Sequence, residues 1–192
     1  MTDSLTAPES NHADICLDCG FCCDGTLFGH AVSSDTPESL VALGLTPTDD
    51  CSSDRSGFRL PCPHFSGSCS IYASRPRVCA NFRCRLLKSV GKGTYSVAQA
   101  RQKVLEAKAL RERLLPAFDA MYADALAAAA LPGARERSLI VRLRLVISTL
   151  MRPENGEFRA RYGKLLMTAF DLASRLSNDF LPEAPSRHVK KI

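Results

Sequence analysis

The chain has 192 residues, enough for one compact domain or two small ones, which excludes a large multidomain enzyme. Hydrophobic residues make up 45% and charged residues 23%, a composition typical of globular proteins and unlike that of disordered, collagen-like or membrane proteins. Charge is uneven: residues 1–90 carry 7 basic and 10 acidic side chains, whereas residues 91–192 carry 18 and 10. This asymmetry predicts a division near residue 90.

The first residues are polar and acidic, without the basic start and apolar stretch of a signal peptide. No later run approaches the roughly 18 consecutive apolar residues that a membrane-spanning helix needs. We therefore expect a cytoplasmic protein with no membrane segment, in which residues 1–14 form a flexible leader.

Residues 15–90 consist of short segments broken by Gly, Pro, Ser and Asp. Strand-like pieces fall at residues 26–28, 58–60 and 70–72, and a short helix is expected to start at Thr36 or Pro37 and end at Gly44. The rest should be mostly loop. Such a region buries too little apolar surface to offset its chain entropy and usually needs a metal or disulfide staple.

Residues 91–180 change to a helical period. Ser96 and Gln99 form a capping box that should begin a long helix, and its apolar stripe runs through Pro116, which should kink or interrupt it. Pro132-Gly133 should end it. A second helix is expected to stop before Pro153, with this apolar face: Leu139, Leu143, Val146, Ile147 and Leu150.

A third helix should start at about Pro153, with one apolar stripe made of Phe158, Tyr162, Leu165, Leu166, Ala169, Ala173 and Leu176. The expected fold is therefore mainly α: an irregular cysteine-rich module with short strands, followed by about three amphipathic helices and a disordered tail over residues 181–192. Because the three helices can bury their stripes together, we expect them to be stable independently of the cysteines.

All nine cysteines lie between residues 16 and 84. A reducing cytoplasm disfavours disulfides, so this clustering argues for metal ligation or redox chemistry. In Cys16-Leu-Asp-Cys19-Gly-Phe-Cys22-Cys23, the two-residue spacing lets a tight turn aim successive sulfurs at one ion. A redox dithiol would instead require one CxxC at a helix start in an α/β context, which is missing.

Cys51 lies in a polar loop outside every motif, and the other eight cysteines are the number that two sites of four thiolates need. Cys22 and Cys23 are adjacent, so in extended backbone their side chains point to opposite sides and could serve two centres. The rival is one centre with four ligands and the remaining cysteines as buried thiols. The candidate ligands are Cys16, Cys19, Cys22, Cys23, Cys62, Cys69, Cys79 and Cys84.

All-thiolate sets select zinc or iron-sulfur clusters. The run Cys-x2-Cys-x2-Cys with a distant Cys62-Pro63 is similar to ferredoxin ligand runs, so an iron-sulfur cluster is favoured slightly and Zn²⁺ is the alternative. Basic side chains near the last two cysteines could offset the negative charge of such a centre, or could simply form a solvated basic surface: Arg75, Arg77, Arg83, Arg85 and Lys88.

Three spaced motifs carry a family resemblance: Cys-x2-Cys-Gly-Phe-Cys-Cys-Asp-Gly, then Leu-Pro-Cys-Pro-His, then Cys-Ser-Ile-Tyr-Ala-Ser-Arg-Pro-Arg-Val-Cys-x2-Phe-x-Cys. Over roughly residues 15–90 the chain resembles the YkgJ-type cysteine-cluster family (CxxCxxCC), a zinc- or iron-chelating domain whose module also occurs in flagellin lysine N-methylases. The resemblance implies the same eight cysteines as ligands, with Tyr72, Arg75 and Pro76 around the last of them. Ala80 departs from the family, which often has Arg there.

His64, two residues after Cys62, could ligate zinc, although a solvent-facing or hydrogen-bonded histidine is more common.

The expected function is metal binding with a structural or redox role. One alternative, a lysine N-methylase-related enzyme, lacks a recognisable S-adenosylmethionine site, so an enzyme is not favoured. Another is an adaptor whose helices bind a protein partner. Nucleic-acid binding is not expected, because the Lys and Arg of the helical half have acidic neighbours, as on a solvated face.

Overall fold

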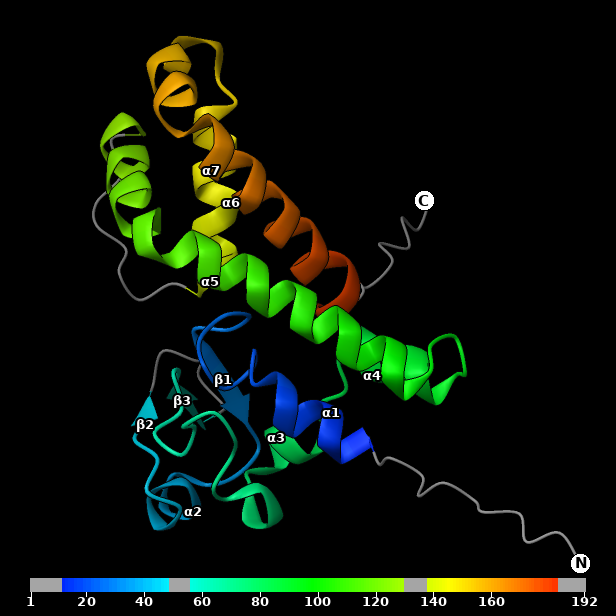
Figure 1. Cartoon of the computed structure of the whole chain (residues 1–192). Coiled ribbons are helices and arrows are strands. Elements are labelled where there is room, and N and C mark those ends of the chain that lie inside the picture. Colours follow the sequence, from blue (N-terminus) through cyan, green and yellow to red (C-terminus); the bar gives the residue numbers. More distant parts are fainter. Residues whose placement is uncertain (1–11, 49–55, 130–137, 183–192) are drawn as a thin grey trace, which may run out of the picture.

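The computed structural model describes residues 12–48, 56–129 and 138–182. Figure 1 shows two layers: three long helices, α5 (Val97–Ala128), α6 (Leu139–Leu150) and α7 (Gly156–Arg175), and beneath α5 a small sheet with short helices. The mainly α fold predicted from the sequence is confirmed. None of the helices in these described ranges combines the length and apolar character that crossing a membrane requires.

The lower layer holds the cysteines. Its strands β1 (His30–Ser33), β2 (Pro47–Thr48) and β3 (Ser56–Arg59) form an antiparallel sheet in the order β1-β3-β2, with Phe58 opposite both Ala31 and Pro47. The short helices α2 (Pro37–Ala42) and α3 (Arg77–Asn81) pack on this sheet, whereas α1 (His12–Cys19) and α4 (Arg85–Gly91) pack on α5 and on each other; a 3-10 turn lies at Tyr72–Ser74.

Local signals predicted part of this layer. Helix α2 is confirmed: the Thr36 hydroxyl caps it by accepting a hydrogen bond from the Ser39 amide at 3.3 Å, and proline follows at the first helical position. The piece at 58–60 overlaps β3. The strands expected at 26–28 and 70–72 are wrong, because β1 starts at His30 and the chain from Ser70 turns into a 3-10 helix. Helix α1 was not predicted, and it makes residues 12–14 of the expected leader helical.

The long helices follow the sequence closely. The capping box is confirmed, since the Gln99 amide donates to the Ser96 hydroxyl at 3.2 Å and the Ser96 amide donates to the Gln99 side chain at 2.8 Å. Helix α5 continues through Pro116 and is bent partway along (Figure 1), as expected where proline removes a backbone donor. Helix α6 ends at Leu150, and a 3-10 turn at Pro153–Asn155 leads into α7. Pro132-Gly133 and the tail after Pro182 lie outside the described residues.

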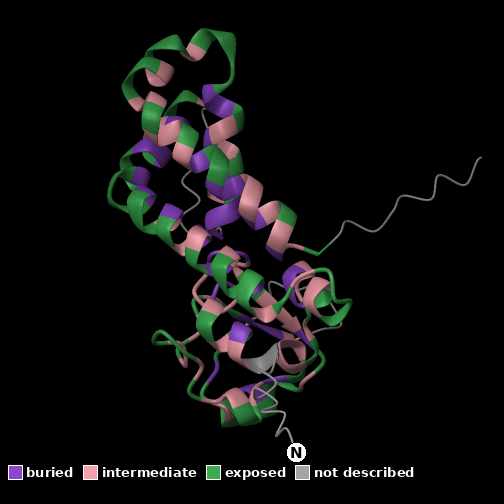
Figure 2. Ribbon diagram, turned by 45° about the vertical axis from the view of Figure 1, so that its right-hand side comes forward, coloured by how far each residue is buried: buried purple, intermediate pink, exposed green. Residues whose placement is uncertain are grey.

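One hydrophobic core joins the two layers. Buried residues of α5, α6 and α7 form one cluster, and Figure 2 shows the buried parts of these helices along their facing sides. The same cluster contains Ile15, Phe21 and Leu27 from the cysteine layer. The fully buried Phe21 ring meets Phe180 edge-on, with 5.1 Å between ring centroids. Residues of the cysteine layer thus complete the core of the helices, which argues against the expectation that the helices are stable independently of the cysteines; that expectation stays a prediction.

A second, smaller core lies under the sheet. Leu40, Leu45 and Phe58 are buried there, and Cys62 and Cys79 are among the partly buried side chains that pack against it.

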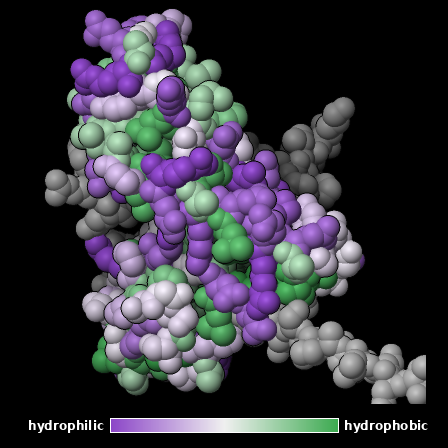
Figure 3. Space-filling model, in the orientation of Figure 1, coloured by the Kyte–Doolittle hydropathy of each residue, from purple (hydrophilic) through white to green (hydrophobic). Residues whose placement is uncertain are grey.

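The outer face of the long helices has a mixed surface: Figure 3 shows hydrophilic side chains with apolar ones between them. The boundaries at residues 14, 90 and 180 stay predictions.

Candidate metal centre

The eight predicted ligands come from five separate segments. Cys16 and Cys19 lie in α1, Cys22 and Cys23 in the turn after it, Cys62 and Cys69 in the loop after β3, Cys79 in α3, and Cys84 at the N-terminal cap of α4. All eight are free thiols; Cys16 is exposed and the other seven are half-buried. Cys51 lies outside the described residues.

The turn after α1 depends on Gly20. Its φ of +71° belongs to the left-handed region that favours glycine. Its carbonyl accepts hydrogen bonds from the amides of Cys23 at 2.8 Å and Asp24 at 3.0 Å, which reverses the chain within one turn. A Cβ at this position would lie 2.1 Å from Cζ of Phe65, so the bare glycine also lets the loop after β3 approach.

A backbone contact brings that loop onto the turn. The Cys62 amide donates to the Cys23 carbonyl at 2.7 Å, and the Phe65 amide donates to the Cys62 carbonyl at 3.1 Å. Phe65 then pairs with Cys69 in an isolated antiparallel bridge. Cys23, Cys62 and Cys69 are thereby held in one region, on the side of the small core that Cys79 also contacts.

The other cysteines of this region face the large core. Cys19, Cys22 and Cys84 are partly buried against it. Burial raises the pKa of the Cys19 thiol from an ordinary 9.0 to about 12 and raises that of Cys22 further, because the charged thiolate loses its hydration. Burial likewise raises the pKa of Cys84.

The same cause acts on the remaining thiols. Burial raises the pKa of Cys23 to about 12 and that of Cys79 to about 11, and it also raises the pKa values of Cys16 and Cys62. Repulsion between neighbouring thiolates adds to this effect. Without a bound cation these seven thiols are therefore protonated at neutral pH.

Packing divides the cysteines into two sets of four. Cys19, Cys22 and Cys84 lie against the large core, with Cys16 on the same helix as Cys19. Cys62 and Cys79 lie against the small core, and backbone contacts hold Cys23 and Cys69 close to Cys62. Within each set every thiol interacts electrostatically with the other three. We call the two sets the first quartet, made of Cys16, Cys19, Cys22 and Cys84, and the second quartet, made of Cys23, Cys62, Cys69 and Cys79. Cys16 also neighbours Cys23, Cys69 and Cys79, and Cys22 neighbours Cys23, so the two quartets adjoin.

Basic side chains oppose the negative charge of the thiolates. Arg75 and Arg83 lower the pKa of Cys16 against the larger effect of burial, and Arg75 does the same at Cys79. Of the five predicted basic residues, Arg77 instead pairs with Asp35, with 3.6 Å between Nε and Oδ1, and Arg85 donates to the Asn178 carbonyl at 3.0 Å. Arg75 also stacks on the Tyr72 ring, 3.7 Å from its centroid, so these two residues support each other.

Helix α5 contributes two basic residues that sequence reasoning missed. Lys108 lowers the pKa of Cys19 and hydrogen-bonds to the Asp18 carbonyl. Arg111 forms an ion pair with Asp24, the residue after the cysteine run, and donates to the Thr26 hydroxyl at 2.9 Å. Both lie more than 20 positions beyond Cys84 in the sequence, so only the packing of α5 on the turn reveals them.

His64 is hydrogen-bonded. Its Nε2 lies 2.5 Å from the Leu43 carbonyl oxygen at the end of α2. This contact favours the hydrogen-bonded alternative over a role in zinc ligation, because the ring nitrogen facing the carbonyl must donate a proton.

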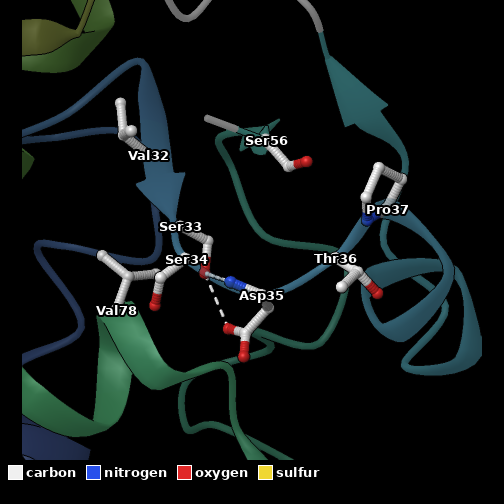
Figure 4. Close-up of a pocket in the computed structure, with 8 residues that line it drawn as sticks. All are labelled: Val32, Ser33, Ser34, Asp35, Thr36, Pro37, Ser56 and Val78. Carbon is white, nitrogen blue, oxygen red and sulfur yellow. Dashed lines mark hydrogen bonds between the residues drawn. The ribbon is translucent and has the colours of Figure 1, made fainter. Parts of the chain in front are cut away.

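A cavity of about 670 Å³ is lined by residues of β1, β3, α2 and α3 and by the loop between β1 and α2 (Figure 4). Its wall includes Ser33, Asp35 and Val78, the residue before Cys79. The Asp35 carboxylate accepts hydrogen bonds from the Ser33 hydroxyl at 2.6 Å and the Arg77 amide at 2.8 Å. Its oxygens are thus engaged in joining β1 to α3.

The donor set fits a thiophilic metal. Soft thiols dominate it, and a bound cation would replace the protons that burial holds on them. In residues 14–48, 56–129 and 138–182, no three Cys, His, Asp or Glu side chains stand close enough together to hold an ion as they are, so binding would have to draw the thiols inward.

Residues 15–105 match the model of the CxxCxxCC family, described as a putative zinc- or iron-chelating domain. The match confirms the resemblance of this part of the chain to the CxxCxxCC cysteine-cluster family that the motifs indicate. The match extends beyond residue 90 into the first turns of α5, which pack on the cysteine turn. Comparisons with curated proteins and with solved structures found no match.

Proposed function

We propose that the protein binds an iron-sulfur centre through its clustered cysteine thiolates, with Zn²⁺ as the alternative metal and a structural or redox role. The observation that supports the proposal is that eight free thiols from five segments lie in one layer, where Cys19, Cys22 and Cys84 pack on the large core and Cys62 and Cys79 on the small core. In a chain with so little regular structure around them, thiols left protonated and half-buried contribute little, whereas a metal would join the segments directly.

Electrostatics support the same function. Four thiolates around one zinc ion or one cluster leave net negative charge, and unscreened negative charge in a half-buried site is costly. Arg75 and Arg83, from the loops before and after α3, and Lys108, from α5, supply positive charge. The iron-sulfur preference comes from the ligand spacing, in which three close cysteines accompany a remote one before proline.

The test is purification without oxygen, followed by iron, zinc and acid-labile sulfide analysis. We expect iron with sulfide, broad visible absorbance and an electron paramagnetic resonance signal after reduction. Stoichiometric colourless zinc would refute the iron-sulfur preference while keeping metal binding. Protein with neither metal would refute the proposed function.

A further inference from the structure

We infer that the eight cysteines form two adjacent metal centres, one held by the first quartet and the other by the second quartet. This inference rests on the proposed metal binding and specifies its ligand grouping. The alternative is a single centre held by Cys16, Cys23, Cys69 and Cys79, whose thiols also interact electrostatically with one another. That alternative leaves Cys19, Cys22, Cys62 and Cys84 without a ligand role.

The first quartet belongs to the helical core. Cys16 and Cys19 stand three residues apart in α1 and therefore share one face of that helix. Cys84 caps α4, which packs beside α1, and Cys19, Cys22 and Cys84 all contact the large core. A centre here would tie α1 and the turn after it to α4.

The second quartet belongs to the sheet. The 2.7 Å hydrogen bond from the Cys62 amide to the Cys23 carbonyl fixes two of its members side by side, and the Phe65 bridge holds Cys69 close to them. Cys62 and Cys79 pack on the small core of Leu40, Leu45 and Phe58. A centre here would tie the loop after β3 to α3.

Cys22 and Cys23 are adjacent in the sequence but belong to different quartets. Cys22 packs on the large core, whereas the carbonyl of Cys23 receives the loop after β3. These different surroundings place the two residues at different parts of the layer, so this pair suits two ions better than one. Because a single peptide bond joins the two ligands, the centres would be neighbours.

The experiment compares metal content per chain in anaerobically prepared variants. Cys19→Ser and Cys62→Ser each remove a ligand that belongs to one quartet only and that the single-centre alternative does not use. We expect each to lose about half of the wild-type metal. The double variant Cys19→Ser/Cys84→Ser should also retain half, whereas Cys19→Ser/Cys62→Ser should retain none. Cys51→Ser is the matched control and should retain all of it.

Wild-type protein gives a second readout that does not depend on variants folding. Two zinc ions or two clusters per chain are expected, and in the reduced cluster form the paramagnetic signals should show coupling between neighbouring centres. One centre per chain, or full metal retention in both Cys19→Ser and Cys62→Ser, would overturn the two-centre inference while leaving metal binding intact. Complete loss in each single variant, with helical circular dichroism preserved, would also overturn it.

Discussion

Replacing Phe21 with alanine tests whether the cysteine layer and the long helices unfold together. Phe21 follows Gly20 in the cysteine turn, is fully buried, and meets Phe180 beyond the end of α7. Truncating a buried phenylalanine costs about 3–5 kcal/mol, which includes roughly 0.5–1.5 kcal/mol from the aromatic pair. The change lies outside the long helices, yet it should destabilise them.

The assay is urea unfolding followed by helical circular dichroism. At a slope of about 2 kcal/mol per molar urea, a loss of about 4 kcal/mol lowers the midpoint by roughly 2 M. The matched control is Phe170→Ala on α7, where the ring is 53% exposed, and its midpoint should change by less than about 0.3 M because surface truncations cost little. If Phe21→Ala leaves the urea midpoint of the helical signal unchanged, the idea that the two layers unfold together would be refuted.

Three further predictions concern the turn after α1, its ion pair with α5 and the buried thiols. Gly20→Ala should cost about 2–4 kcal/mol by denaturation, from the positive φ and the clash with Phe65, whereas Gly91→Ala, with nothing within 4 Å, should not destabilise. Arg111→Met should cost about 1–3 kcal/mol by leaving Asp24 without its half-buried partner, and the exposed Arg113→Met should be neutral within about 0.5 kcal/mol. In metal-free reduced protein, the thiols of Cys19 and Cys23 have a pKa of 9.0 when unfolded and about 12 when folded. Between these two values the unfolded chain loses protons before the folded chain does, so the free energy of unfolding should fall as the pH rises from 9.0 toward about 12. An increase in stability over this range would contradict the burial of Cys19 and Cys23.

Local signals predicted the helices well. The capping box at Ser96 and Gln99, the Thr36 cap and the stripe that includes Leu143 involve residues within one or two turns of each other, so sequence alone specifies them. Helix α1 was not predicted because it has only eight residues and is held by distant partners. One of these is Arg101 of α5, whose Nε lies 3.2 Å from the Asp18 carboxylate.

Contacts between remote segments could not be predicted. The strands expected at 26–28 and 70–72 are wrong because strand positions depend on pairing between remote segments, such as β1 and β3, which lie more than 20 residues apart. The motifs predicted the eight candidate ligands, but their grouping arises from the approach of the Cys62 loop to Cys23. Lys108 and Arg111 carry no motif, and only the packing of α5 places them beside the turn.

Native mass spectrometry of the anaerobically purified chain tests the central claim, metal binding by the cysteines, most directly. The account predicts a mass above that of the polypeptide by the bound iron and sulfide, or by zinc, which returns to the polypeptide mass after acid denaturation. A native mass equal to that of the bare chain, or lowered by two hydrogens for each disulfide formed among the cysteines, would contradict it.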